Sequence, residues 1–216
     1  MAAAERLFAG EGIDGVSLRE INRAAGARNA IAVQYHFEDR RGVLEAIMDK
    51  HRPEVEARRH AMLDQYEADG VPGLRKLAAA LVRPAASKLT DPDGGPEYLQ
   101  ISAELLNRAR APISRPSEGS PDSMSRWRAA VMPLLAPGSG ELHRRFTTIR
   151  FAAMELGRRA RSGPHADDRL FISHLIDLVG GLLAVELSEE TQRLHTERDN
   201  AMGRRSAQHN HLHMED

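Results

Sequence analysis

The sequence predicts an all-α fold. Of its 216 residues, 41% are hydrophobic but only 4% are aromatic, and Ala, Leu, Arg and Glu, which all favour helices, dominate. In most of the chain the apolar residues recur every three or four positions, as they do along one face of an amphipathic helix. Loops such as APGSG and SGPHADD separate these segments. We therefore expect a series of helices joined by loops.

Composition and charge exclude several classes of protein. The chain has no cysteine, which excludes disulfides and thiolate metal sites. Its first residues carry charges, unlike a signal peptide. The longest apolar run, 175–187, contains Asp177 and Glu186 and is too short to cross a bilayer. We expect a cytoplasmic protein with no membrane segment, although its net charge of −1 gives no hint of nucleic-acid binding.

Residues 17–44 predict a helix-turn-helix and the start of a further helix. Ser17, with a glutamate three residues later, has the pattern of a capping box. Gly26 marks the turn, because a left-handed backbone is cheap only for glycine. Asn29 suits the N-cap of the second helix, and Asp39 suits the N-cap of the next one. In this motif the second helix enters the major groove of DNA.

The order of these motifs resembles the N-terminal DNA-binding segment of TetR-type transcriptional regulators. The resemblance rests on FAGEGIDGVSLREINRAAG, QYHF and EDRRGVLEAI, and it covers about residues 2–48. It implies a three-helix DNA-binding domain over 1–48, followed by a helical ligand-binding and dimerisation domain, which we place at 49–200. In this family a small-molecule ligand usually relieves repression, and the last two helices of the second domain pair across a two-fold axis.

We expect DNA contacts of two kinds from this segment. Contacts with phosphate oxygens are expected from Ser17 at a capped helix start, from the phenol of Tyr35 and from the guanidinium of Arg40. At the base edges, an arginine can hydrogen-bond to guanine, an asparagine or glutamine amide can hydrogen-bond to adenine, and a small side chain can contact the thymine methyl group. The candidates for the bases are Arg28, Asn29, Ala30 and Gln34, with His36 suited to either role. Tyr35 and Phe37 are alternatively core aromatics, an interpretation that we favour for Phe37 only.

The helix from Arg40 is expected to run past Pro53 to about residue 67. Because proline removes a backbone hydrogen bond, we expect a bend near His51. Arg58 and Arg59 are expected on a solvated face of this helix. Further helices are predicted over 72–89, 97–110, 124–135 and 141–160, with a last one from about residue 171.

The last predicted helix carries two apolar rows. One row suffices to attach a helix to its own domain, so a second row indicates a second copy of the chain; a fully buried central helix is the alternative. We expect a homodimer that binds an inverted-repeat operator in double-stranded DNA. The residues predicted for its interface are Phe146, Ile149, Ala153, Phe171, Leu175, Leu178, Leu182 and Val185.

A cavity in the second domain is expected to bind an apolar or amphipathic small molecule. Such a ligand acts only through different affinities for two arrangements of the DNA-binding domains. Trp127 is also explained by packing in the hydrophobic core, which is the alternative to a place in the cavity wall. The candidate lining residues are Leu81, Tyr98, Ile101, Leu105, Trp127, Phe151 and Met154.

No motif in the sequence indicates an enzyme. The patterns HExxH and GxSxG and a phosphate-binding glycine loop are absent. Three alternate histidines in HNHLHMED suit a metal, but a disordered tail over 201–216 explains them better. We expect no cofactor and no metal. The sequence therefore predicts a DNA-binding transcriptional regulator, a repressor released by a ligand; the alternative is a dimeric helical ligand-binding or interaction protein that has lost DNA binding.

Overall fold

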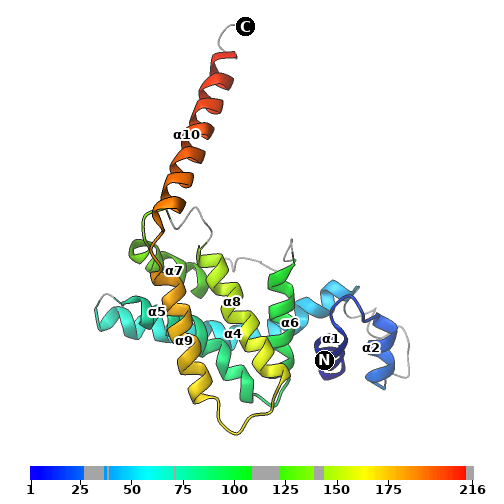
Figure 1. Ribbon diagram of the computed structural model, residues 1–216. Coiled ribbons are helices and arrows are strands. Elements are labelled where there is room, and N and C mark those ends of the chain that lie inside the picture. Colours follow the sequence, from blue (N-terminus) through cyan, green and yellow to red (C-terminus); the bar gives the residue numbers. More distant parts are fainter. Residues whose placement is uncertain (27–36, 38, 71, 109–121, 139–143, 213–216) are drawn as a thin grey trace.

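The chain folds entirely into helices in the computed structural model (Figure 1). The structure describes residues 1–26, 37, 39–70, 72–108, 122–138 and 144–212, with side chains described up to Ala201. In these ranges all regular structure is α-helix or short 3₁₀-helix, which confirms the all-α prediction. In chain order the elements are α1 (Ala2–Glu11), α2 (Leu18–Ala24), α4 (Arg40–Ala68), α5 (Leu74–Ala86), η1 (Ser87–Thr90), α6 (Gly95–Asn107), α7 (Ser123–Val131), η2 (Met132–Leu134), α8 (Arg144–Arg161), α9 (Arg169–Ala184) and α10 (Glu189–Leu212).

The boundaries of α2 follow from its sequence signals. Ser17 caps its first turn, and the reciprocal bonds between Ser17 and Glu20 complete a capping box. After the helix, Gly26 adopts a φ of +64°, a left-handed conformation that other residues adopt at a cost. The predicted start and turn of this helix are therefore confirmed.

A smaller hydrophobic core joins α1 and α2 to the beginning of α4. Phe8, Ile13 and Val16 are each 1% exposed, and Ile47 is fully buried, as expected for residues that pack under the motif. Ile101 of α6 belongs to the same core. The N-terminal helices consequently pack against α6 as well as against α4.

The larger core lies between α4, α5, α6, α7, α8 and α9. Leu77, Trp127 and Ile176 are fully buried there. The Trp127 indole N–H donates to the carbonyl of Leu77 at 2.7 Å, so the one polar atom of the ring is satisfied and the ring packs as core. Because α4 contributes to both cores, it connects the N-terminal helices to the rest of the molecule.

The helix α4 is longer than any other helix in the described ranges. Asp39 caps it by accepting a hydrogen bond from the N–H of Gly42 at 2.8 Å, as predicted. The helix then continues for 29 residues with Pro53 inside it. Its N-terminal third buries Val43 and Ile47 in the smaller core, and Leu63 lies in the larger one.

The last helix, α10, extends away from the body of the molecule (Figure 1). This differs from the disordered tail expected over 201–216, since α10 continues to Leu212. Before residue 201, α10 has side-chain pairs one turn apart, an ion pair of Arg193 with Glu197 and a contact of His195 with Asp199, and such pairs stabilise a helix only weakly. No single helix among the described residues has the length and hydropathy of a membrane span; α9 and the first part of α10 reach them only together, across a bend of 54°.

Helices α6 and α8 approach each other closely at Gly157. A Cβ atom added at Gly157 of α8 would lie 2.7 Å from the Cβ of Ala103 and 3.2 Å from the carbonyl oxygen of Leu99. Real Cβ atoms do not come that close, so glycine is needed here for packing. At Gly180 of α9, by contrast, the nearest atom would be 3.9 Å away.

We expect Gly157→Ala to lower the free energy of unfolding by about 1–3 kcal/mol, because the added methyl group forces α6 and α8 apart. The matched control, Gly180→Ala, should leave it unchanged or raise it by up to about 1 kcal/mol, since alanine favours a helix interior. Urea denaturation of both variants measures the difference. Equal effects at the two positions would contradict the close packing of α6 on α8.

Candidate functional site

The predicted DNA-binding motif lies at one end of the molecule, where α1 and α2 pack beside the start of α4 (Figure 1). The segment expected to contact the bases falls outside the residues that the structure describes. This applies to Arg28, Asn29, Ala30, Gln34, Tyr35 and His36. Of the predicted DNA contacts, Ser17 and Arg40 are described.

Ser17 lies exposed at the start of α2. Its backbone N–H and its hydroxyl group both donate to Oε2 of Glu20 at 2.7 Å, and the hydroxyl oxygen accepts from the N–H of Glu20 at 3.3 Å. These hydrogen bonds lower the pKa of the Glu20 carboxyl group. The start of α2 is therefore held in one geometry at the surface.

Arg40 reaches back from the start of α4 to the loop between α1 and α2. Its Nη1 donates to the carbonyl oxygens of Ile13 at 3.2 Å and Asp14 at 3.1 Å, and its side chain remains 43% exposed. Arg40 and Ser17 line the same open hollow, between this loop and the start of α4. The structure thus brings the two described candidates together, and it gives Arg40 a structural contact that the sequence did not indicate.

The carboxyl end of α6 holds the loop between α1 and α2. The carboxylate of Glu104 accepts from the N–H of Ile13 at 3.0 and 3.2 Å. The guanidinium of Arg108 binds both carboxylate oxygens of Asp14, at 3.2 and 2.8 Å, and also binds Glu104 at 2.8 Å. A displacement of this end of α6 would therefore pull directly on the DNA-binding motif.

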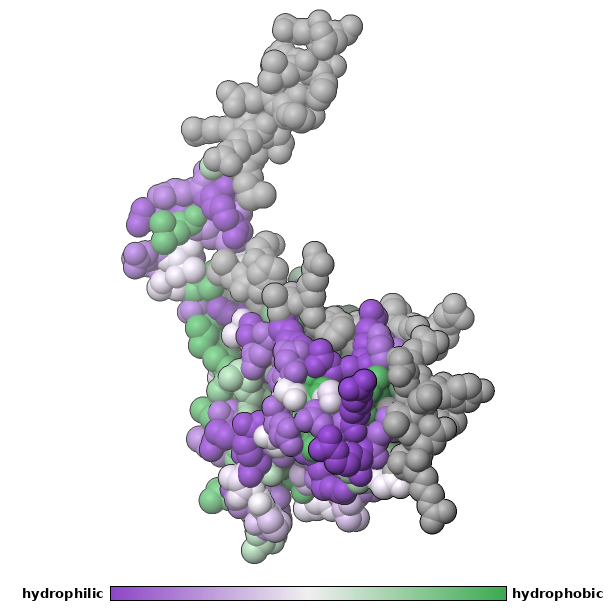
Figure 2. All heavy atoms as spheres, turned by 90° about the vertical axis from the view of Figure 1, so that its right-hand side faces the viewer, coloured by the Kyte–Doolittle hydropathy of each residue, from purple (hydrophilic) through white to green (hydrophobic). Residues whose placement is uncertain are grey.

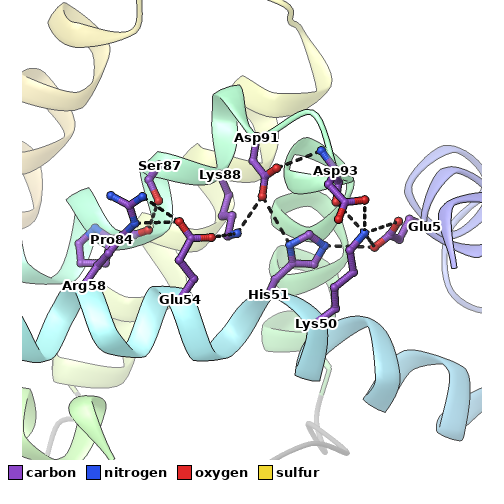
Figure 3. A network of polar contacts seen from close by, with 10 residues as sticks. All are labelled: Glu5, Lys50, His51, Glu54, Arg58, Pro84, Ser87, Lys88, Asp91 and Asp93. Atoms are coloured by element: carbon purple, nitrogen blue, oxygen red, sulfur yellow. Dashed lines mark hydrogen bonds and ion pairs between the residues drawn. The ribbon is translucent and has the colours of Figure 1, made fainter.

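The other end of α6 meets α1 at a buried carboxylate, Glu5, which is 1% exposed. Figure 3 shows Glu5 facing Lys50 and His51 of α4. The Lys50 ammonium donates to Oε1 of Glu5 at 3.0 Å and to the carboxylate of Asp93 at 2.7 Å, and Nε2 of His51 lies 3.1 Å from the same Glu5 oxygen. A buried carboxylate is stable only when it is paired in this way. Glu5 consequently fixes α1 against α4 and the segment before α6.

The same network continues to Lys88 of η1, which is 3% exposed (Figure 3). Its ammonium group donates to Asp91 at 2.8 Å and to Glu54 at 2.5 Å. Burial opposes the charge of Lys88, but these two hydrogen bonds outweigh it and raise the pKa. Within the described residues no cluster of His, Asp or Glu has the arrangement of a metal site.

A cavity of about 190 Å³, partly open to solvent, lies between α4, α5, α6, α7 and α8. Tyr98 of α6 connects this cavity to the network, because it lines the cavity and its ring centroid lies 4.8 Å from that of His51. Apolar side chains form most of the wall. They are Val55, Leu81, Ala85, Leu99, Leu106, Met124, Ile149, Ala152, Ala153 and Leu156.

The remaining cavity residues are polar, and one corrects the sequence analysis. Arg59, expected on a solvated face, is 4% exposed and lines the cavity together with Arg52, Glu56 and Ser102. Its guanidinium group donates to the carbonyl of Ala80 at 3.2 Å, to Glu56 at 3.2 Å and to the hydroxyl oxygen of Ser123 at 2.7 Å. The spacing of positions 52, 55, 56 and 59 along α4 is the signal that was available, since it places all four on one face.

The predicted ligand-binding residues take different places in the structure. Leu81 and Tyr98 line the cavity. Ile101 and Leu105 do not line the cavity and lie in the smaller core with α1, against which Tyr98 also packs. Trp127 is buried in the larger core, Phe151 is half-buried against it, and Met154 is exposed.

A larger hollow of about 510 Å³ lies at the start of α9, between Arg159, Asp167 and Leu170. It is open to solvent, and Leu170 on its rim is 83% exposed. The cavity behind Tyr98 is the more enclosed of the two and is lined by buried and half-buried side chains, most of them apolar, which is typical of a small-molecule site.

The surface formed by α8 and α9 contains exposed apolar side chains. Phe146, Met154, Leu170, Leu178 and Val185 are between 42% and 83% exposed. Figure 2 shows green patches along the left-hand edge of the body, which is the side formed by the helices at the front of Figure 1. An apolar surface of this kind is typical of a protein–protein interface.

The residues predicted for a dimer interface divide between this surface and the interior. Phe146, Leu178 and Val185 are exposed, whereas Ala153, Phe171 and Leu182 are half-buried. Ile149 and Leu175 are buried within the subunit, Ile149 at the wall of the cavity. The second apolar row of α9 also faces the interior, since Ile176, Val179 and Leu183 are fully buried.

Comparison with known proteins gives one match. Residues 1–47 match the family model described as bacterial regulatory proteins, tetR family. Neither the curated proteins nor the solved structures gave a match. The matched segment comprises α1, α2 and the beginning of α4, so the resemblance inferred from the sequence motifs is confirmed.

The network around Lys88 should make stability depend on pH. Hydrogen bonds from Lys88 and from the N–H of Asp93 lower the pKa of the Asp91 carboxyl group below 3.8. A carboxyl group whose pKa is lower in the folded state stabilises the fold above its unfolded pKa, and this contribution is lost as the pH falls through the lowered value. We therefore expect Asp91→Asn to lower the free energy of unfolding at neutral pH by about 1–2 kcal/mol.

Chemical denaturation at a series of pH values measures this effect. The difference between the parent and Asp91→Asn should shrink as the pH falls below about 4. Glu190→Gln, at an exposed position of α10, serves as the control and should have little effect at any pH. A difference for Asp91→Asn that does not change with pH would contradict the assigned pairing.

Proposed function

Because residues 1–47 match the model of the tetR family of bacterial regulatory proteins, we propose that the chain is a DNA-binding transcriptional regulator of this family, and that it is a homodimeric repressor that a small molecule releases from its operator. The observation that carries this proposal is the family match over residues 1–47, which falls on a correctly capped helix and glycine turn. The family is one of regulators, so we propose no enzymatic activity. We place the protein in the cytoplasm, where its operator DNA is.

In the proposed complex, Ser17, Tyr35 and Arg40 bind phosphate oxygens. Two of these, Ser17 and Arg40, share one hollow, which supports a common contact with one stretch of DNA backbone. The base contacts are assigned to Arg28, Asn29, Ala30 and Gln34, with His36 in either role. A two-fold dimer then presents two such segments to the two halves of an inverted repeat.

The exposed apolar face of α8 and α9 supports dimerisation. Its side chains, among them Leu170, Leu178 and Val185, are at least 42% exposed in the single subunit. Burying this apolar area against a second copy is favourable by roughly 25 cal/mol for each Å² removed from water. A two-fold arrangement uses the same surface on both subunits.

The cavity behind Tyr98 supports the proposed effector site, since α6 forms part of its wall and also contacts the DNA-binding motif. On the cavity side α6 presents Tyr98 and Ser102. Towards the motif it presents Glu104 and Arg108. A ligand that prefers a displaced α6 would therefore shift the population away from the DNA-binding arrangement.

The direct test is selection of bound fragments from genomic DNA, followed by fluorescence anisotropy with the selected duplex. We expect an inverted repeat whose binding weakens steeply as salt rises, because each phosphate contact releases counterions. If the protein binds no duplex even at low salt, DNA binding has been lost and the ligand-binding or interaction protein is the better interpretation.

For the phosphate contacts, we expect Arg40→Ala and Tyr35→Phe each to weaken operator binding by about tenfold or more, as the loss of a hydrogen bond to a charged group does. Arg40→Ala should also reduce the slope of log affinity against log salt by about one for each subunit. Arg83→Ala, at an exposed position of α5, is the control. Parental affinity in both variants would show that these backbone contacts are wrongly assigned.

For the dimer, we expect Leu178→Glu to give monomers, because two carboxylates would be buried against each other or against apolar groups at the two-fold interface. Sedimentation velocity measures the mass. Met132→Glu changes another exposed apolar residue, 47% exposed on η2, and should leave the mass at that of the parent. A parent that sediments as a monomer at micromolar concentration would contradict the proposal itself.

A further inference from the structure

We propose that the effector is a small organic acid, with an apolar skeleton of about ten non-hydrogen atoms that ends in a carboxylate. This proposal rests on the proposed function, since it takes the cavity behind Tyr98 as the effector site. It adds the chemical class of the ligand, which follows from how apolar and polar side chains divide the cavity wall.

The size of the skeleton follows from the volume of the cavity. An apolar cavity of about 150 Å³ holds one benzene molecule, so about 190 Å³ leaves room for a ring and a short arm. Leu81, Leu99, Ile149 and Leu156 line this space and are at most 9% exposed. A skeleton of that size would therefore be surrounded by hydrocarbon, which favours an apolar group without hydrogen-bonding atoms.

The polar end of the cavity contains a buried cation, Arg59. Its side chain is 5% exposed, and its Nε and Nη1 groups are bonded to Ala80, Glu56 and Ser123. Among the described residues no hydrogen-bond partner faces its Nη2 group. Burial lowers the pKa of this guanidinium group, and Glu56 opposes the shift. A buried guanidinium with an open donor beside a cavity is suited to a carboxylate, which it can bind at two oxygens.

A second cation and two hydroxyl groups also line the cavity. Arg52 lies on the same face of α4 as Arg59 and lines the cavity. Among the described residues its one ion-pair partner is Asp49, at 3.7 Å. Tyr98 and Ser102 both line the cavity, and the Ser102 hydroxyl group is hydrogen-bonded to the Tyr98 phenol. Burial raises the pKa of the Tyr98 phenol, so the phenol stays protonated and can donate. Two guanidinium groups and the phenol have enough donors to satisfy both oxygens of a carboxylate.

Glu56 is the acidic residue at the cavity, and it does not attract a cationic ligand. Its Oε1 accepts from Arg59 at 3.2 Å, and its Oε2 accepts from the backbone N–H of Ser123 at 2.7 Å. Both oxygens are thus occupied by the protein. The cavity lining contains two cationic side chains, Arg52 and Arg59, and one carboxylate, Glu56. This excess of positive charge disfavours a cationic ligand.

A carboxylate at this end would also lie next to the contact between the domains. Tyr98 stacks near His51, and His51 holds Glu5 of α1. Drawing Tyr98 towards a bound carboxylate would loosen its contact with His51. The anionic end of the ligand, rather than its apolar skeleton, would accordingly be the part that releases DNA.

The experiment uses three probes of one skeleton that differ in charge, namely phenylacetate, phenylacetamide and 2-phenylethylamine. Their binding to the full-length protein without DNA is measured by isothermal titration calorimetry. We expect phenylacetate to bind at least tenfold more tightly than the amide, and the amine to bind least. The complete loss of a charged hydrogen bond accounts for a ratio of this size.

Two matched variants locate the carboxylate. Arg52→Gln removes one cation from the cavity, and it should bring the affinities for phenylacetate and phenylacetamide to within about threefold of each other. Arg58→Gln removes a cation from the same helix, at an exposed position that pairs with Glu54 outside the cavity, and it should preserve the parental ratio. Both substitutions change side chains that are at least 33% exposed, so both variants are expected to fold.

The outcomes separate the two proposals. If the amide or the amine binds as tightly as phenylacetate, or if none of the three binds, the carboxylate assignment is overturned. Operator binding, measured separately by anisotropy, is unaffected by that result and continues to test the regulator proposal. If phenylacetate binds as expected but the protein binds no duplex, the acid site stands and the proposed repressor function fails.

Discussion

The buried carboxylate of Glu5 is the interaction on which the arrangement of the two parts depends. It lies on α1 and is 1% exposed, and it is stable there only because Lys50 and His51 of α4 bind it. Replacing one partner would leave a buried charge, which costs far more than the pair contributes. The N-terminal helices therefore have one orientation against α4, and the position of the DNA-binding motif follows from the position of this carboxylate.

The two helices that carry these contacts also form the cavity wall. The face of α4 with Arg52 and Arg59 lines the cavity, while Lys50 and His51 face α1. α6 has the same division, with Tyr98 towards the cavity and Glu104 towards the loop between α1 and α2. A ligand and a DNA duplex would thus act on the same two helices, which is the physical requirement for coupling between two sites.

Parts of the candidate site could be predicted because their signals are local. The capping box at Ser17, the glycine turn at Gly26 and the cap at Asp39 each involve residues within four positions, and all three are present as expected. Arg59 could not be assigned in this way. Its burial depends on Ala80 and Ser123, which are 21 and 64 positions away along the chain, and the spacing along α4 shows only that Arg59 shares a face with positions 52, 55 and 56, not that this face is buried.

By itself, the sequence determined that this chain is helical, where its helix-turn-helix motif lies and which family model that motif matches, because periodicity, capping and turn residues act over one or two helical turns. Only the tertiary structure decided which apolar row of each helix is buried. Leu175 and Leu178 belong to one predicted row, yet Leu175 is 1% exposed and Leu178 is 42% exposed. That difference arises from the packing of α9 on α5 and α8, and residues distant in the chain determine how those helices cross.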